Sequence, residues 1–215
     1  MKKKTTVLFD FDGTIMDTND IIIKSWQHTF QTLEGRERSL EEILETFGEP
    51  LRITMERVLP DFDTEKAIEI YRSYQFEHYR ELIELFPGMK ELIEGLKQKG
   101  YKLGVVTSRL RNSTEIGLKK YGLIGYFDTI VTADDTNKHK PDPEPIRIAL
   151  EKLNSEPQET IMIGDSMFDV LCAQNAGVEA VLVSWAMATD AQSKLQDVKP
   201  EHVIEKAEEL WTILR

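Results

Sequence analysis

Two aspartates two residues apart, Asp10 and Asp12, carry the strongest chemical signal in the chain. They follow the apolar and β-branched run Thr5–Phe9, which predicts a buried strand that ends where the acids begin. Carboxylates at such a strand end are costly unless they are ionised and paired, and hard oxygen ligands favour Mg²⁺. A carboxylate is also a nucleophile that can form an acyl phosphate. The segment therefore indicates metal-assisted phosphoryl chemistry, and the alternative is a solvated Asp-Gly turn.

Reactive side chains recur in three later segments. Leu103–Ser108 is an apolar run that ends in two hydroxyl groups. Lys140 precedes Pro141, and Ile161–Asp169 is an apolar run that ends in an acidic loop. The carboxyl ends of parallel strands share one edge of an open sheet, where ligands bind. These residues are therefore expected to meet at one site although they lie far apart along the chain.

The 215 residues carry a formal net charge of −11, from 27 basic and 38 acidic residues. An acidic chain argues against a nucleic-acid partner, although a metal and a few local cations could hold a small phosphorylated substrate. Apolar runs stay well short of the roughly 20 residues that span a bilayer, so no membrane partner is expected. We also expect a monomer or weak homodimer.

The single Cys172, expected in the core, excludes an intrachain disulfide and indicates a reducing, cytoplasmic location.

Helical spacing dominates residues 18–85. Apolar side chains recur every three or four positions over 22–30, 40–47 and 67–82, which predicts three amphipathic helices. Ser39 is a suitable N-cap for the second of them, because acidic residues follow it. The block contains little strand signal, so it is expected to be an all-helical insertion.

Helices and strands alternate after residue 88. We expect helices at 88–99, 111–121, 143–153, 166–176 and 205–214, and strands at 102–107, 128–132, 160–164 and 179–184, with one more short strand before the last helix. Such alternation predicts a parallel sheet flanked by helices. The fold is therefore expected to be α/β, with a doubly wound, Rossmann-like core of residues 1–17 and 86–215 that is interrupted by a helical domain of residues 18–85.

The segment Asp10–Thr14 and the three later segments occur in the order typical of the haloacid dehalogenase (HAD) superfamily. The chain resembles this family over nearly its whole length. The resemblance implies that residues 18–85 form a helical cap and that the core is a phosphatase. In that reaction Asp10 is the nucleophile that forms an aspartyl phosphate, while Asp12 protonates the leaving oxygen and then activates water.

The resemblance also implies a phosphate site. Thr107 donates its hydroxyl group, and Lys140 supplies a positive charge to both the nucleophile and the phosphate. Backbone N–H groups at Phe11, Gly13 and Ser108 are expected to complete the cradle, since amides at strand ends form anion sites.

A magnesium site is implied beside the nucleophile. Asp165 is expected to bind Mg²⁺ together with Asp10 and the backbone carbonyl of Asp12, since Mg²⁺ takes few protein ligands and keeps several waters. Asp169, one helical turn after Asp165, is expected just outside the metal ligands, where it orients Lys140 or contacts the metal through water. The alternative for Asp169 is a solvated acid in the first turn of a helix.

The acids discriminate among members of the family. Dehalogenases lack the second acid and the metal cluster, so Asp12 and Asp165 favour a phosphatase. A related mutase carries a catalytic histidine where Ile22 stands here, and this difference argues against mutase activity. A phosphorylation-switch receiver domain would leave the helical insertion unexplained. A catalytically silent binding or regulatory relative remains the alternative of another class.

Five segments resemble the phosphoglycolate phosphatase and bacterial pyrophosphatase branch of the family: residues 17–18, 48–51, 106–111, 140–145 and 183–185. The resemblance implies inorganic pyrophosphate as the substrate, with phosphoglycolate or another small phosphomonoester as the alternative. Glu49 and Arg52, expected between two cap helices, and Arg109, just after the phosphate-site threonine, are candidate substrate contacts. A solvated helix arginine is the alternative for Arg52.

Overall fold

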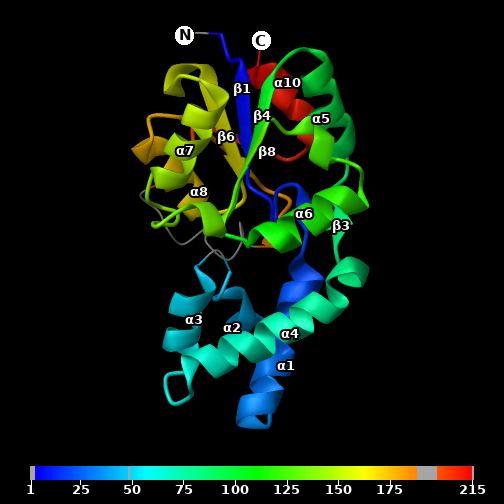
Figure 1. Ribbon diagram of the computed structural model, residues 1–215, viewed down its shortest axis with the longest axis vertical. Helices are drawn as coiled ribbons and strands as arrows, with labels where there is room; N and C mark the ends of the chain where they lie inside the picture. The colour runs from blue at the N-terminus through cyan, green and yellow to red at the C-terminus, as the bar shows by residue number, and fades with distance from the viewer. Residues whose placement is uncertain (1–2, 48, 188–197, 215) are drawn as a thin grey trace. The chain divides into compact units, whose positions relative to one another are not determined.

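The computed structural model of the protein describes residues 3–47, 49–187 and 198–214 (Figure 1). The chain separates into two compact units, Met1–Asp17 with Leu85–Arg215, and Thr18–Glu84. The chain passes between them at two short strands, β2 (Met16–Asp17) and β3 (Glu84–Leu85), which form a two-stranded sheet. Among the residues described, no helix is both long enough and apolar enough to cross a membrane.

A parallel sheet forms the centre of the first unit. Its strands are β1 (Thr6–Phe9), β4 (Lys102–Val106), β5 (Thr129–Val131), β6 (Thr160–Gly164), β7 (Glu179–Val183) and β8 (His202–Ile204). Their order is β5-β4-β1-β6-β7-β8, and all neighbours pair in parallel. Every residue of β1 is buried, as expected for a parallel strand that is covered on both faces. The strand order reverses beside β1, so a crevice is expected at its carboxyl end.

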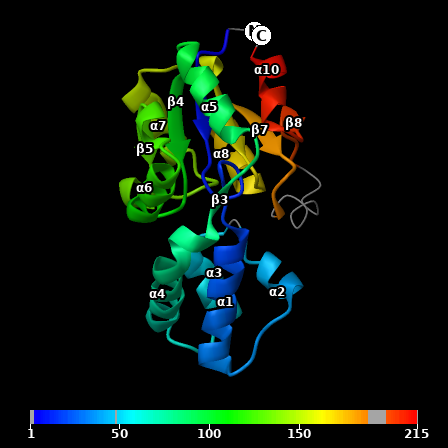
Figure 2. The same cartoon turned by 90° about the vertical axis from the view of Figure 1, so that its right-hand side faces the viewer.

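Helices cover both faces of this sheet (Figures 1 and 2). The helices are α5 (Met89–Gln98), α6 (Arg111–Lys120), α7 (Glu144–Leu153), α8 (Met167–Asn175) and α10 (Leu210–Ile213). On one face, α7 packs on β4 and β5, while α8 packs on β6 and β7. On the other face lie α5 and α10, where the Lys99 ammonium stands 4.2 Å from the centre of the Trp211 ring. The core predicted from the alternation of elements is therefore confirmed.

The C-terminal helix is shorter than predicted. Instead of a helix over 205–214, a 3₁₀ turn at Ala207–Glu209 leads into α10. Lys206 has an extended backbone, with φ −141° and ψ 147°, so helical geometry begins only after it.

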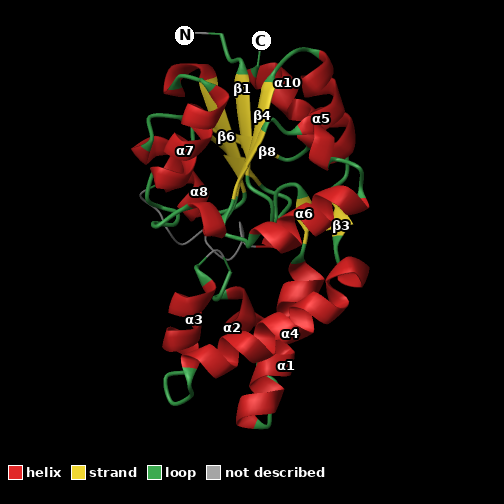
Figure 3. Ribbon diagram, viewed as in Figure 1, coloured by secondary structure: helices red, strands yellow, loops and turns green. Residues whose placement is uncertain are grey.

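The described residues of the second unit form helices, as predicted, and Glu84 at its end begins β3 (Figure 3). Its helices are α1 (Asn19–Glu34), α2 (Leu40–Leu44), α3 (Leu51–Val58) and α4 (Thr64–Leu82). Trp26 on α1 stacks on Phe30, with ring centres 5.3 Å apart, and meets the ring of Tyr71 on α4 edge-on at 5.2 Å. Ser39 is the N-cap of α2 and forms a capping box with Glu42, as its position predicted.

One helix of this unit, α3, was not predicted. Arg52 was expected in a connection between two helices, but it lies in the first turn of α3. Pro50 stands directly before the helix, a position where proline is well tolerated.

The tight packing around β4 predicts a specific cost for enlarging Gly104. A Cβ atom there would lie 2.7 Å from Leu8 Cδ2 and 3.0 Å from Thr129 Cγ2, and Leu8 is fully buried. Gly104→Ala should therefore lower the free energy of unfolding by about 1–3 kcal/mol, the usual cost of overpacking. Gly125→Ala is the matched control, because a Cβ atom at Gly125 meets nothing within 4 Å. Equal urea midpoints for the two variants would contradict the close fit.

Candidate active site

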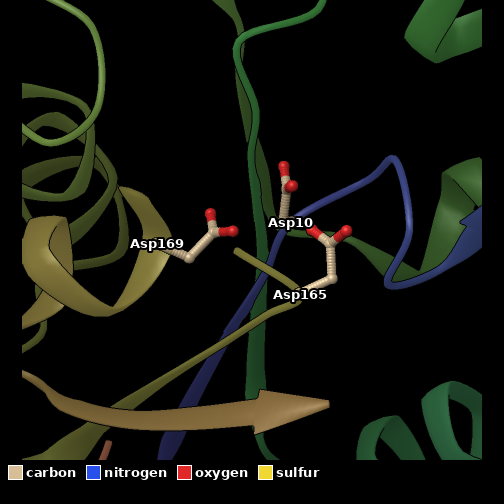
Figure 4. A group of neighbouring side chains, drawn as sticks. All are labelled: Asp10, Asp165 and Asp169. Atoms are coloured by element: carbon tan, nitrogen blue, oxygen red, sulfur yellow. The ribbon is translucent and has the colours of Figure 1, made fainter. Parts of the chain in front are cut away.

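Three buried carboxyl groups meet at the carboxyl edge of the sheet. The N–H of Asp10 donates to the carbonyl of Ile163 at 2.8 Å, which carries the pairing of β1 and β6 one residue further. Asp165 directly follows β6, and Asp169 lies in the first turn of α8. One carboxylate oxygen from each aspartate lies within 4.8 Å of the others, and Figure 4 shows the three groups directed toward a common space. This group could hold a metal ion.

Lys140 lies against this cluster. Its Nζ is 2.8 Å from Asp10 Oδ1 and 2.5 Å from Asp169 Oδ1, and the residue is only 5% exposed. Burial opposes the charged form, but the two carboxylates outweigh it and raise the pKa of Lys140. The nearby Lys138 is placed differently. It forms an exposed ion pair with Asp142 at 3.4 Å. Lys140 therefore brings a permanent positive charge to the nucleophile candidate.

Asp169 is held from both sides. Its Oδ2 accepts hydrogen bonds from the N–H of Ser166 at 3.1 Å and from the Ser166 hydroxyl at 2.6 Å, while Oδ1 pairs with Lys140. Ser166 is the N-cap of α8 and forms a capping box with Asp169. A Cβ atom at Gly164 would come within 2.3 Å of the Asp169 Cβ, so this close approach requires glycine. The arrangement suits a residue that orients the lysine.

The carboxylates are electrostatically crowded. Burial, together with the charges of Asp169 and Asp12, raises the pKa of Asp10 to about 7, although Lys140 opposes the shift. Burial and the charges of Asp169 and Asp10 also raise the pKa of Asp165 well above its ordinary value. Buried hard oxygen donors with excess negative charge fit a divalent cation such as Mg²⁺, which would favour the ionised form of both acids.

The loop after β1 makes room for Asp165. Gly13 has φ +71°, and a Cβ atom there would lie 2.0 Å from Asp165 Oδ2. The Gly13 N–H was expected to face a phosphate, but it donates to the carbonyl of Met16 at 2.9 Å. The backbone N–H groups of Phe11 and Ser108 are the remaining candidates for donors to a phosphate. The Phe11 side chain is fully buried in the core, so only its backbone could serve.

Thr107 and Arg109 come from the loop after β4, next to β1 in the sheet. Thr107 is buried, and its hydroxyl accepts the N–H of Arg109 at 3.2 Å. The Arg109 Nε lies 3.0 and 2.9 Å from the two carboxylate oxygens of Asp12, and Nη2 lies 2.8 Å from Asp12 Oδ1. This pair was not predicted from the sequence. No local pattern signals it, because 97 positions separate the partners.

The two cap candidates, Glu49 and Arg52, lie in the helical unit. Glu49 Oε2 is 2.7 Å from Arg57 Nη2 and accepts the Thr54 hydroxyl at 3.2 Å. Arg52 Nη2 is 2.5 Å from Glu65 Oε1 in an exposed ion pair. Both residues therefore have partners within their own unit. Gly48, which belongs to the same resembling segment, lies outside the described residues.

Comparisons with known proteins show the family of the chain. The profile of a family described as haloacid dehalogenase-like hydrolase matches residues 7–183. The chain is 39% identical over 212 residues to pyrophosphatase PpaX of Bacillus mycoides, and 38% identical over 212 residues to that of Bacillus velezensis. Each alignment covers 99% of this chain and 97% of the relative.

Solved structures show the same fold. A haloacid dehalogenase-like family hydrolase from Streptococcus pneumoniae has a TM-score of 0.89 at 26% identity, with both chains fully covered. A candidate phosphoglycolate phosphatase from Lactobacillus plantarum has a TM-score of 0.84 at 29% identity, over 99% of this chain and 100% of that one.

The crowded carboxylates predict a pH-dependent stability of the metal-free protein. Folding raises the pKa of Asp10 from 3.8 to about 7, so the folded state binds more protons between these values. Stability from this group must therefore fall as pH rises through that window. In EDTA we expect a lower Tm at about pH 8 than at about pH 6, and Mg²⁺ should raise the Tm more at about pH 8, where its ligands are ionised.

The control for this titration is Asp165→Asn. It removes one of the crowded charges and should reduce both the pH dependence in EDTA and the effect of Mg²⁺. If Mg²⁺ raises the Tm of the wild-type protein equally at the two pH values, the proposed ligand set is contradicted.

Proposed function

Because the chain belongs to the haloacid dehalogenase-like hydrolase family, we propose that it is a Mg²⁺-dependent phosphohydrolase that acts through an aspartyl phosphate and prefers inorganic pyrophosphate. The observation that carries the proposal is the buried carboxylate of Asp10, set against Lys140 within a cluster that fits a divalent cation. The full-length similarity to proteins named pyrophosphatase PpaX supports the substrate. Similarity to the Lactobacillus plantarum protein supports phosphoglycolate as the second candidate.

The first half of the reaction transfers the phosphoryl group to Asp10. A carboxylate oxygen of Asp10 attacks phosphorus, and the bond to the leaving oxygen breaks while Asp12 supplies its proton. The Lys140 ammonium offsets the negative charge of the nucleophile and of the phosphoryl oxygens. When bound by Asp10, Asp165 and the Asp12 carbonyl, Mg²⁺ would reduce the repulsion between two anions.

The second half returns Asp10 to its carboxylate form. Asp12, now ionised, removes a proton from water, which attacks the phosphorus and releases phosphate. Asp169 keeps Lys140 in place, since their contact does not depend on the ionised state of Asp10. Thr107 donates its hydroxyl to the phosphoryl group, and the amides of Phe11 and Ser108 supply further donors in this proposal.

The helical unit serves as a cap in this proposal. Lid closure over a phosphoryl group excludes water and adds contacts to the leaving group. Glu49 and Arg52 are the proposed specificity residues.

A cytoplasmic location and a monomeric or weakly dimeric state remain predictions.

The nucleophile assignment predicts the effect of Asp10→Asn. An amide is a poor nucleophile, so phosphate release from pyrophosphate should fall by at least about 10³-fold. Asp61→Asn, a change of the same kind at an exposed position, should retain activity. Phosphate release is measured with Mg²⁺ and with EDTA, which should abolish it. Turnover by Asp10→Asn at the wild-type rate would reject the mechanism.

The cap assignment predicts a change of selectivity rather than of chemistry. Wild-type kcat/KM should be higher for pyrophosphate than for phosphoglycolate, nucleotides and sugar phosphates. Arg52→Ala should alter this ranking by about tenfold, the scale of one lost charged contact, while p-nitrophenyl phosphate turnover changes little. Arg36→Ala, an exposed arginine of the same unit, is the control. Poor turnover of pyrophosphate by the wild type would reject the substrate, and an unchanged ranking would reject the cap residue.

A further inference from the structure

The ion pair between Asp12 and Arg109 is the strongest feature that the proposed mechanism leaves unused. The guanidinium approaches side-on, so that Nε and Nη2 both face the carboxylate at 2.8–3.0 Å. The Arg109 side chain is 6% exposed and that of Asp12 is 27% exposed. Shielding from water strengthens such a forked ion pair. The two bonds of the pair hold the Asp12 carboxylate in one orientation.

The position of this pair restricts where Arg109 can act. In the proposed function, on which this inference rests, the leaving oxygen must come within hydrogen-bond distance of the Asp12 carboxyl group. The Arg109 guanidinium is within hydrogen-bond distance of that same carboxyl group. A leaving group that receives the proton of Asp12 therefore lies beside the guanidinium.

The backbone of Arg109 is held by hydrogen bonds that do not involve its guanidinium group. Its N–H donates to the Thr107 hydroxyl at 3.2 Å, and its carbonyl accepts the N–H of Ala133 at 3.0 Å. The first contact ties Arg109 to Thr107, the proposed phosphate ligand, and the second ties it to the segment after β5. A guanidinium forks onto phosphate and carboxylate equally well, so it can exchange one for the other.

We propose that Arg109 exchanges partners during the reaction and so selects substrates with an anionic leaving group. In the substrate-free protein it holds Asp12. When a substrate with a negatively charged leaving group binds, the guanidinium moves to that group and frees Asp12 to reach the leaving oxygen. Pyrophosphate meets this requirement through its second phosphate, and phosphoglycolate meets it through its carboxylate. An alkyl phosphate without a second charge does not.

The test compares substrates with and without a negative charge on the leaving group. Phosphoglycolate carries a carboxylate where ethyl phosphate carries a methyl group, and pyrophosphate is the third substrate. Arg109→Met should lower kcat/KM for pyrophosphate and phosphoglycolate by roughly 10- to 100-fold, the loss of a charge-assisted pair, and should leave ethyl phosphate within about threefold. Arg109→Lys should recover part of the loss, since it keeps the charge without the fork.

Arg111→Met is the matched control. This arginine stands two residues further on and pairs with Asp135 at 2.5 Å, so its loss should affect the three substrates equally. Equal losses on all three substrates in Arg109→Met would overturn the exchange, because they would show that Arg109 only maintains the structure. No loss on pyrophosphate would overturn it as well.

A binding measurement separates this inference from the proposed function. In the Asp10→Asn background with Mg²⁺, calorimetry should show pyrophosphate binding weakened at least about tenfold by Arg109→Met, with ethyl phosphate binding nearly unchanged. Equal weakening for both ligands would overturn the exchange. Absence of phosphate release from every substrate by the wild type would overturn the proposed function, while the binding comparison would still decide the role of Arg109.

Discussion

The crowding of buried carboxylates at the carboxyl ends of β1 and β6 is the constraint on which the site depends. Asp10, Asp165 and Asp169 come within 4.8 Å of one another in a region shielded from water. Such a cluster is unfavourable by itself, as the raised pKa of Asp10 shows. The surrounding chain accommodates it through glycines at positions 13 and 164, where a Cβ atom would collide with the aspartates. A stable parallel sheet is needed to hold groups together that repel one another.

Much of the fold follows from local patterns in the sequence. The buried strands are continuous apolar runs, and the amphipathic helices α1 and α4 repeat every three or four residues, so their types were predictable. The short strands β2 and β3 were not predicted, because two residues are too few to show a period. Helix α3 was missed because residues 48–52 were expected to connect two helices, although proline is common at helix starts.

The candidate site was predictable in its residues but not in its pairing. Each acid and hydroxyl follows a strand in the sequence, so the topology explains why they meet. Burial decides which lysine joins them, because Lys138 and Lys140 are of the same type and only Lys140 is buried against the acids. The contact of Asp12 with Arg109 depends on the adjacency of β1 and β4 and has no local signature. In contrast, Ser166 and Asp169 have capping-box spacing, a signal that the sequence did contain.

Lys140 has two anionic partners, and one of them is unaffected by the proposed chemistry. Phosphorylation of Asp10 in the proposed reaction removes one partner of Lys140. The other partner is Asp169, which lies 2.5 Å from the Lys140 Nζ and is itself fixed by Ser166. Removing one partner of a buried pair is strongly destabilising when it leaves the other charge uncompensated. The second carboxylate avoids that state for Lys140, so the lysine can keep both its charge and its position through two steps. In the proposed reaction, Asp169 would thus balance the buried Lys140 ammonium while the charge of Asp10 changes.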